Sequence, residues 1–209
     1  MMKNILLALF SFVASVGQAQ DNVFRPFTVD TVDFVIEGTA SEGADSVCLE
    51  ERPYKQPQLF PVHNGRFRIV TRQPMYKFLQ IEDKYDGFAT VIVDDRPARV
   101  EVDFRTNKVV EGSPLNKRFN QYTLVEEGIE KEMELHENDA DLCIYDSLER
   151  RLGEVGWKSV IENLDNVIPV YFLALNGQYC MISPEQLSEC MGREYAFTHH
   201  PDMKRVWKF

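Results

Sequence analysis

Four cysteines are the residues of this chain best suited to carry chemistry, because thiols can exchange electrons or join into disulfides. They are Cys48, Cys143, Cys180 and Cys190, and no two of them form a Cys-x-x-Cys pair. A dithiol oxidoreductase needs two sulfurs close enough to exchange through a mixed disulfide, so this spacing does not predict such a site. Structural disulfides and buried, unpaired thiols are both compatible with an even count. The pair to examine first, as a possible disulfide, is Cys180 and Cys190.

Histidines and carboxylates are the other side chains that hold metals. His199 and His200 are adjacent, but zinc needs three or four ligands, and no second histidine pair stands elsewhere to complete a shell. The acidic stretch 137–146 suggests a calcium loop. Counted from Asp139, however, its fifth and sixth positions are cysteine and isoleucine, where the loop requires an oxygen ligand and a glycine. We therefore predict no metal site and no cofactor.

Catalytic motifs of other kinds are missing from the sequence. It contains no Gly-x-Ser-x-Gly motif and no glycine-rich phosphate loop. Asp94 and Asp95 are a carboxylate pair, but adjacent residues on a strand point to opposite faces, so a turn before Pro97 explains them better. We interpret all four histidines as non-catalytic. The sequence predicts that the chain is not an enzyme and has no catalytic residues.

Charge and aromatic content limit the partners. The chain has 33 acidic and 23 basic residues, for a net charge of −10, and no lysine or arginine cluster that would contact phosphates. Nucleic acid is therefore excluded as a partner. The 14 phenylalanines and 8 tyrosines fall mostly at core spacings, although aromatic side chains also line grooves that bind peptides or glycans.

The first nineteen residues have the features of a secretory signal peptide. Lys3 precedes an apolar run from Ile5 to Val16, and the small residues Gly17 and Ala19 occupy the −3 and −1 positions of a cleavage site. The run is too short to span a bilayer. We predict cleavage after Ala19, no transmembrane anchor in the mature chain, and a periplasmic or extracellular location.

Residues 32–111 alternate between apolar and polar side chains, as half-buried strands do. The pattern predicts seven or eight short strands with no helical crossover between them. Asn64-Gly65, between Val62 and Phe67, predicts a hairpin, because both turn residues tolerate positive φ. After the leader (residues 1–19), we expect residues 20–112 to form an antiparallel β-sandwich.

After Gly112 the apolar spacing becomes that of a helix. Ser113-Pro114 supplies an N-cap and a first-turn proline for a helix from Pro114 to about His136. Its other face, interpreted as a solvated surface, carries Glu126, Glu127, Glu130, Glu132, Glu134 and Glu137. A second helix to about Asn163, a buried helix over 169–173 and a capped helix over 183–190 complete a helical extension, residues 113–209. The predicted fold is mainly β with added α-helices.

The order of these motifs resembles that of a bacterial domain of unknown function, which precedes the thioredoxin-like domain of secreted thiol-disulfide oxidoreductases and peroxiredoxin-type proteins. The matching segments are residues 34–38, 62–67, 110–116, 160–166 with Pro169, 183–187 and 200–201. Together they extend over nearly the whole mature chain. The resemblance implies a β unit and a helical connector without redox residues of their own.

In that family the segment after His200-Pro201 continues into the thioredoxin-like domain, whereas this sequence stops at Phe209. We expect either a stand-alone member or a truncated reading frame. The resemblance implies a non-catalytic accessory role in positioning, substrate docking or dimerisation, with a thioredoxin-like envelope protein or a second copy as partner. Two alternatives remain open: a sandwich that binds a peptide or glycan, and a residual redox protein that uses Cys180 and Cys190.

Overall fold

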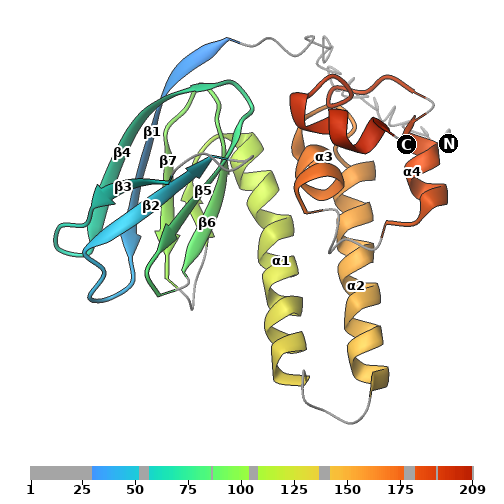
Figure 1. Cartoon of the computed structure of the whole chain (residues 1–209), viewed down its shortest axis with the longest axis horizontal. Coiled ribbons are helices and arrows are strands. Elements are labelled where there is room, and N and C mark those ends of the chain that lie inside the picture. The colour runs from blue at the N-terminus through green and yellow to red at the C-terminus, as the bar shows by residue number, and fades with distance from the viewer. Residues whose placement is uncertain are drawn as a thin grey trace, which may run out of the picture.

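Eight strands in two sheets, followed by a set of helices, make up the described part of the chain (Figure 1). The structure is a computed structural model and describes residues 30–51, 57–85, 87–103, 108–136, 142–176, 182–191 and 193–208. The predicted signal peptide lies outside these residues. The strands are β1 (Thr31–Ala40), β2 (Ser46–Glu51), β3 (Gln58–Pro61), β4 (Arg66–Pro74), β5 (Phe78–Asp83), β6 (Phe88–Ile92), β7 (Ala98–Val102) and β8 (Lys108–Glu111).

Each sheet has four strands. One has the order β4-β1-β7-β8, and the other has the order β3-β2-β5-β6. The pairings are antiparallel except that of β1 with β7, in which Ile36 lies opposite Ala98 and Ala40 opposite Val102. The prediction of purely antiparallel strands is wrong at this pair. Between β1 and β7 the chain forms the four strands of the second sheet and also β4, which pairs antiparallel with β1. Strand β7 then lies on the other side of β1 and runs in the same direction.

The Asn64-Gly65 turn has the local geometry that the sequence predicts. Both residues have positive φ, 52° and 71°, and His63 and Arg66 exchange two backbone hydrogen bonds of 2.8 and 3.0 Å. The flanking strands do not form a hairpin in one sheet, however, because β3 pairs with β2 and β4 pairs with β1. Turn chemistry sets the reversal of the chain, but it does not choose the sheet that each strand joins.

One cluster of buried apolar side chains is shared by strands of both sheets. It includes Phe34 of β1 and Ile69 of β4 from the first sheet, and Leu49 of β2 and Ile81 of β5 from the second, each at most 1% exposed. Gly38 leaves room in this cluster, because a Cβ there would lie 2.5 Å from Cζ of Phe67. Period-two alternation thus buries one face of β1 and of β4, whereas β3 has no buried residue.

The helices predicted to start at Pro114 and at 183–184 are present. The helix predicted over 169–173 is a three-residue α-helix continued by a π-helical segment, and the 3₁₀ segment over 201–208 was not predicted. The helical elements are α1 (Pro114–His136), α2 (Leu142–Ile161), α3 (Ile168–Val170), the π-helical segment η1 (Tyr171–Leu175), α4 (Pro184–Met191) and the 3₁₀ segment η2 (Pro201–Lys208). At the start of α1, the Ser113 hydroxyl accepts the N–H of Asn116 at 3.1 Å. At α4, Ser183 and Gln186 form the predicted reciprocal capping box, with bonds of 2.8 and 3.2 Å.

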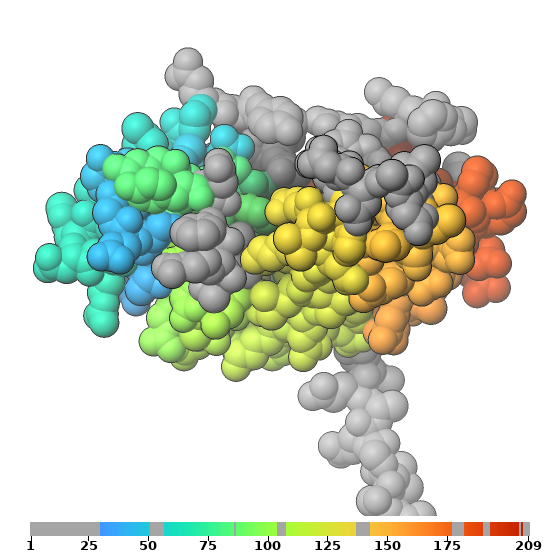
Figure 2. All heavy atoms as spheres, turned by 90° about the horizontal axis from the view of Figure 1, so that it is seen from below, coloured from blue at the N-terminus to red at the C-terminus, as the bar shows by residue number. Residues whose placement is uncertain are grey.

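A second apolar cluster joins the helices to the second sheet. Phe78 of β5 and Ile92 of β6 contribute from the sheet, and Phe119 of α1 and Phe172 of η1 contribute from the helices. In both views α1 lies between the strands and α2 (Figures 1 and 2). Among the described residues, none of the helices combines the length and hydrophobicity needed to cross a bilayer.

Candidate binding pocket

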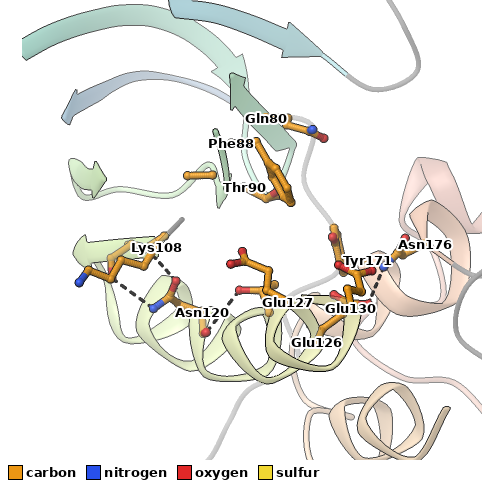
Figure 3. A pocket seen from close by; sticks show the side chains of 13 residues that line it. Gln80, Phe88, Thr90, Lys108, Asn120, Glu126, Glu127, Glu130, Tyr171 and Asn176 are labelled. Carbon is orange, nitrogen blue, oxygen red and sulfur yellow. Dashed lines mark hydrogen bonds between the residues drawn. The ribbon is translucent and has the colours of Figure 1, made fainter. Parts of the chain in front are cut away.

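A small cavity of about 120 Å³ lies between α1 and the strands it packs against (Figure 3). Strands β5, β6 and β8 form one side, α1 the other, and η1 the end. Phe88 and Thr90 come from β6, while Tyr171 and Asn176 lie at the far side, beyond the acidic residues of α1 (Figure 3). The cavity is therefore closed by residues that are distant in the sequence.

Three glutamates of α1 line this cavity. Glu126, Glu127 and Glu130 are spaced i, i+1 and i+4, which places them on one side of a helix. Glu126 is 3% exposed, and its Oε1 accepts a hydrogen bond of 2.6 Å from Nδ2 of Asn176. Within the described part of the chain, the half-buried carboxylates of Glu127 and Glu130 accept no hydrogen bond. This side of α1 is therefore a wall of the cavity.

Burial changes the proton affinity of these two carboxyl groups. It raises the pKa of Glu127 from 4.5 to about 7, although Lys131 on the same helix acts in the opposite direction. Burial, with a smaller contribution from Glu134, also raises the pKa of Glu130. Half-buried carboxyls with raised pKa in a cavity are a common feature of functional sites. At pH 7 the Glu127 carboxyl is therefore about half ionised, and the charge of Lys131 offsets its burial only in part.

Among the other side chains that line the cavity, Phe88 and Tyr171 are aromatic, and the polar groups of Asn120 and Lys108 already have partners. Asn120 is fixed by β8, where its Oδ1 accepts the N–H of Val109 at 2.8 Å and its Nδ2 donates to the carbonyl of Val109 at 3.3 Å. The ammonium of Lys108 lies 3.0 Å from Oε2 of Glu101 on β7. The only basic side chain in the described lining is thus paired with a different carboxylate.

The predicted solvated face of α1 is wrong for the three glutamates in the cavity. The interpretation assumed that charged residues off the apolar stripe face water, but α1 packs against β6 and β8 on this side as well. Glu132 does lie at the surface, 3.1 Å from Arg151 of α2, and Glu134 is exposed, whereas Glu137 lies outside the described residues. No local signal separates these three acids from the exposed Glu134, because acidic residues at this spacing also occur on solvated helix faces.

The cysteines are placed only in part. Cys180 lies outside the described residues, and the position of the Cys190 side chain is not described, so their disulfide stays a prediction. Cys48 is half-buried on β2 and Cys143 is exposed on α2. Burial raises the pKa of the Cys48 thiol. The described residues contain no group of three His, Cys, Asp or Glu side chains arranged to hold a metal ion.

Asp94 and Asp95 do not act as a pair. Asp94 is 5% exposed, whereas Asp95 is exposed. The Asp94 carboxylate accepts hydrogen bonds from the Ser113 hydroxyl, from Nδ2 of Asn116 at 3.2 Å and from the N–H of Arg96 at 3.0 Å. Burial raises the pKa of Asp94. The chain bends before Pro97 as predicted, but the bend is not a hairpin turn, because β6 and β7 lie in different sheets. The Asp94 carboxylate also joins the end of β6 to the start of α1.

Asn116 completes this joint between sheet and helix, which sequence reasoning missed. Its side chain is fully buried. The Oδ1 atom accepts the N–H of Ile92 at 2.8 Å, and Nδ2 donates to the carbonyl of Ile92 at 2.7 Å. A polar residue directly after Leu115 in the apolar stripe was the available signal. The Asn116 amide thus pairs with the edge of β6 as the backbone of a neighbouring strand would.

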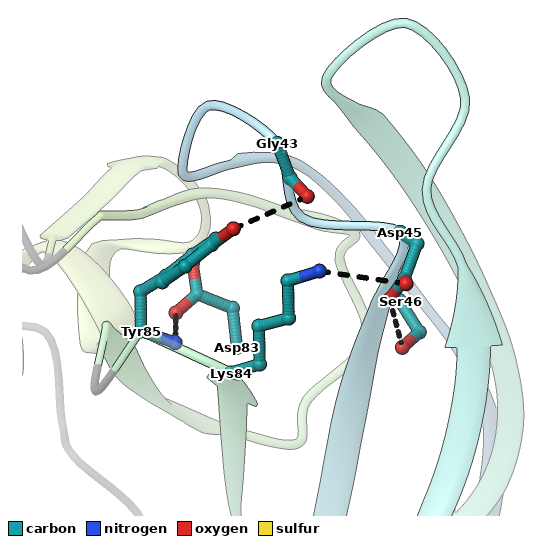
Figure 4. A network of polar contacts seen from close by, with 6 residues as sticks. All are labelled: Gly43, Asp45, Ser46, Asp83, Lys84 and Tyr85. Carbon is teal, nitrogen blue, oxygen red and sulfur yellow. Dashed lines mark hydrogen bonds and ion pairs between the residues drawn. The ribbon is translucent and has the colours of Figure 1, made fainter.

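A second polar network connects two loops at one end of the sheets (Figure 4). The carboxylate of Asp83 accepts the backbone N–H groups of Ser41, Tyr85 and Gly87 at 3.0, 2.8 and 3.1 Å. Nζ of Lys84 lies 3.4 Å from Asp45 in the other loop. These bonds satisfy backbone donors and hold the loops together, which is a structural role.

Neither a protein-family model nor a curated protein sequence matches this chain.

Proposed function

We propose that this chain is a non-catalytic binding module of the bacterial cell envelope whose acidic pocket takes a small organic cation. The single observation that carries the proposal is the pair Glu127 and Glu130, half-buried in a cavity of about 120 Å³ without hydrogen-bond partners among the described residues. Buried carboxylates are costly unless they are paired. A bound cation would donate hydrogen bonds to these carboxylates and balance the charge that Lys131 offsets only in part.

The size and walls of the cavity favour an amine or guanidinium group. An engineered protein cavity of roughly 150 Å³ holds benzene, so this one accommodates a group of about six heavy atoms. Phe88 and Tyr171 offer aromatic rings to a cation that has lost its water. A bare metal ion would need more oxygen ligands at fixed distances than two carboxylates provide.

Titration calorimetry with three small probes tests this proposal. Methylguanidinium and n-butylammonium are expected to bind, whereas 1-butanol, which has a similar size and no charge, is not. Because Glu127 has a pKa of about 7, cation binding at pH 7 should release up to about half a proton. Repeating the titration in buffers of different ionisation enthalpy measures that release.

Matched variants make the result specific to the pocket. Replacing both carboxylates (Glu127→Gln with Glu130→Gln) should abolish cation binding and proton release. Glu154→Gln, at an exposed position of α2, should leave both unchanged. Equal affinity for the alcohol and the two cations would contradict the proposal, as would undiminished binding by the double variant.

Two finer features belong to the same proposal. The shared apolar cluster of strands from both sheets supports their packing face to face as a β-sandwich. The predicted leader supports export. Mass spectrometry of the chain recovered from the envelope fraction of the native host should find a mature N-terminus at Gln20. Recovery from the cytoplasm with Met1 intact would contradict the assignment to the envelope.

The second candidate is an accessory role beside a thioredoxin-like envelope protein. It is favoured because residues within the resembling segments join different elements. Asn116 joins α1 to β6, Asn163 of the α2–α3 turn donates to the Tyr122 hydroxyl of α1 at 3.0 Å, and His200 contacts the β4–β5 turn. A rigid connector of this kind would hold a partner in a fixed position.

Insulin reduction distinguishes this accessory role from a residual redox activity. The purified chain alone should show no turnover, and its addition should change the rate of a thioredoxin-like envelope protein. Robust turnover by the chain alone would instead favour redox use of Cys180 and Cys190. Peptide mass spectrometry without reductant shows whether those two thiols are joined.

A further inference from the structure

His200 lies in the apolar cluster between the helices and the second sheet. It is 2% exposed, and its ring centroid is 6.1 Å from that of Phe78 on β5, in an edge-on arrangement. On either side of it in the chain, Phe197 and Met203 are fully buried in the same cluster. The segment 193–208 is thus anchored to the rest of the protein around this imidazole.

The hydrogen bonds of the ring define its protonation state. The backbone N–H of Asp202 donates to Nδ1 at 3.2 Å, so Nδ1 is an acceptor and carries no proton. Nε2 lies 3.2 Å from the carbonyl oxygen of Tyr76, which can only accept, so Nε2 carries the proton. The closed arrangement therefore requires a neutral imidazole with its hydrogen on Nε2.

The residue that Nε2 of His200 contacts, Tyr76, lies in the β4–β5 turn and has an uncommon backbone conformation. Tyr76 has a φ of 64°, which a bulky residue rarely adopts unless its surroundings hold it there. Its N–H donates to the carbonyl of Val93 at 2.7 Å, and its carbonyl faces His200. The histidine is therefore one of the groups that hold the β4–β5 turn in place.

We propose that His200 is a proton-operated clasp, which holds segment 193–208 against the β4–β5 turn when neutral and releases it when Nδ1 is protonated. A proton on Nδ1 meets the N–H of Asp202 head-on and destroys that hydrogen bond. The new charge would also lie among aromatic side chains, out of contact with water. Opening the segment returns the imidazolium to solvent.

Two charged groups act on the ring, in opposite directions. The carboxylate of Asp202 lies 3.6 Å from Nδ1 and favours the imidazolium, and Lys77, next to the contacted carbonyl, opposes it. Burial is the largest influence and lowers the pKa of His200, whereas the hydrogen bond to the Tyr76 carbonyl raises it, and the net effect is a pKa below 6.5. The clasp is therefore closed at neutral pH and weakens as the pH falls below the ordinary histidine pKa.

The expected size of the effect follows from proton linkage. The open segment titrates at the ordinary histidine pKa of 6.5 and the closed one below it, so the opening equilibrium should increase between pH 7.5 and pH 5.5, by at most about tenfold. Hydrogen exchange monitored by mass spectrometry measures it, after correction for the intrinsic pH dependence of exchange. The peptides to follow are those that contain residues 74–78 and 193–208.

Matched variants identify the group responsible. His200→Gln replaces the ring with an amide that can donate and accept but does not titrate, so protection should become independent of pH. His199→Gln alters the exposed neighbouring histidine, 60% exposed in its side chain, and should behave like wild type. Lys77→Gln removes the opposing charge and should move the transition to higher pH.

Several results would overturn the clasp. They are unchanged protection of wild type at pH 5.5, a loss of protection spread equally over the strands, and an identical loss in a folded His200→Gln variant. If that variant does not fold, ¹⁵N NMR of the wild-type imidazole decides the question. It should report the Nε2–H tautomer at pH 7.5 and a transition midpoint that coincides with opening. The opposite tautomer, or a midpoint unrelated to opening, would refute the clasp.

Discussion

Replacing Glu127 by glutamine should stabilise the protein at alkaline pH. The pKa of Glu127 rises from 4.5 to about 7, and each pKa unit corresponds to about 1.4 kcal/mol. Full ionisation therefore costs the folded state up to about 3 kcal/mol. Because the side chain keeps some contact with water, we expect an observed gain of about 2 kcal/mol in the free energy of unfolding.

The direction of the pH dependence is fixed by linkage. The folded state binds this proton more tightly than the unfolded chain, so the cost is absent below pH 4.5, grows between pH 4.5 and pH 7, and is complete above pH 7. Urea unfolding at pH 4 and pH 8 should show wild type and Glu127→Gln equal at pH 4 and separated at pH 8. Glu154→Gln is the control and should match wild type at both. Equal stability at pH 8, or the same gap at both pH values, would refute the burial of this carboxylate.

Four further substitutions test the packing and the hydrogen bonds of the fold. Asn116→Leu leaves two backbone groups of β6 without partners and should cost about 2–4 kcal/mol in urea unfolding, and a loss below half a kcal/mol would contradict the joint. Gly38→Ala places a Cβ against Phe67 and should lower the free energy of unfolding by about 1–3 kcal/mol. Gly128→Ala, in the middle of α1 with open space around it, should raise it by about 0.5–1 kcal/mol. Asp83→Asn keeps only one accepting oxygen for three N–H donors and should lower the thermal midpoint, by an amount corresponding to about 1–3 kcal/mol; an unchanged midpoint would show that the loop network is dispensable.

Local signals in the sequence predicted the elements well. The bounds of α1 follow from Ser113-Pro114 at its start and apolar residues at spacings of three and four, and the structure has the same bounds. The Asn64-Gly65 turn is also present, although the strands on either side of it do not pair as the predicted hairpin. The partner of each strand was not predictable in this way, because period-two alternation is the same in parallel and antiparallel pairs. The pairing of β1 with β7 depends on how the whole chain returns.

The candidate site was harder to predict than the fold. A glutamate on the polar side of an amphipathic helix normally faces water, and nothing local to Glu127 distinguishes it from the exposed Glu134. The difference arises from β6 and β8, which lie against one part of α1. Asn116 is similar, because its role depends on the unpaired edge of β6. The pair His199-His200 stands out in the sequence, but nothing in the sequence indicates that His200 is buried.

The parallel contact between β1 and β7 has a consequence for the order of folding. β1 is the inner neighbour of both β4 and β7, and its register with β7 joins residues about sixty positions apart in the chain. Contacts between distant residues slow folding, because a long loop must close before they form. When the chain is synthesised from its N-terminus, β1 can pair with β4 but cannot complete its pairing with β7 until residue 102 has been made. The exposed edge of β1 would be the part of the molecule most in need of protection against aggregation during that interval.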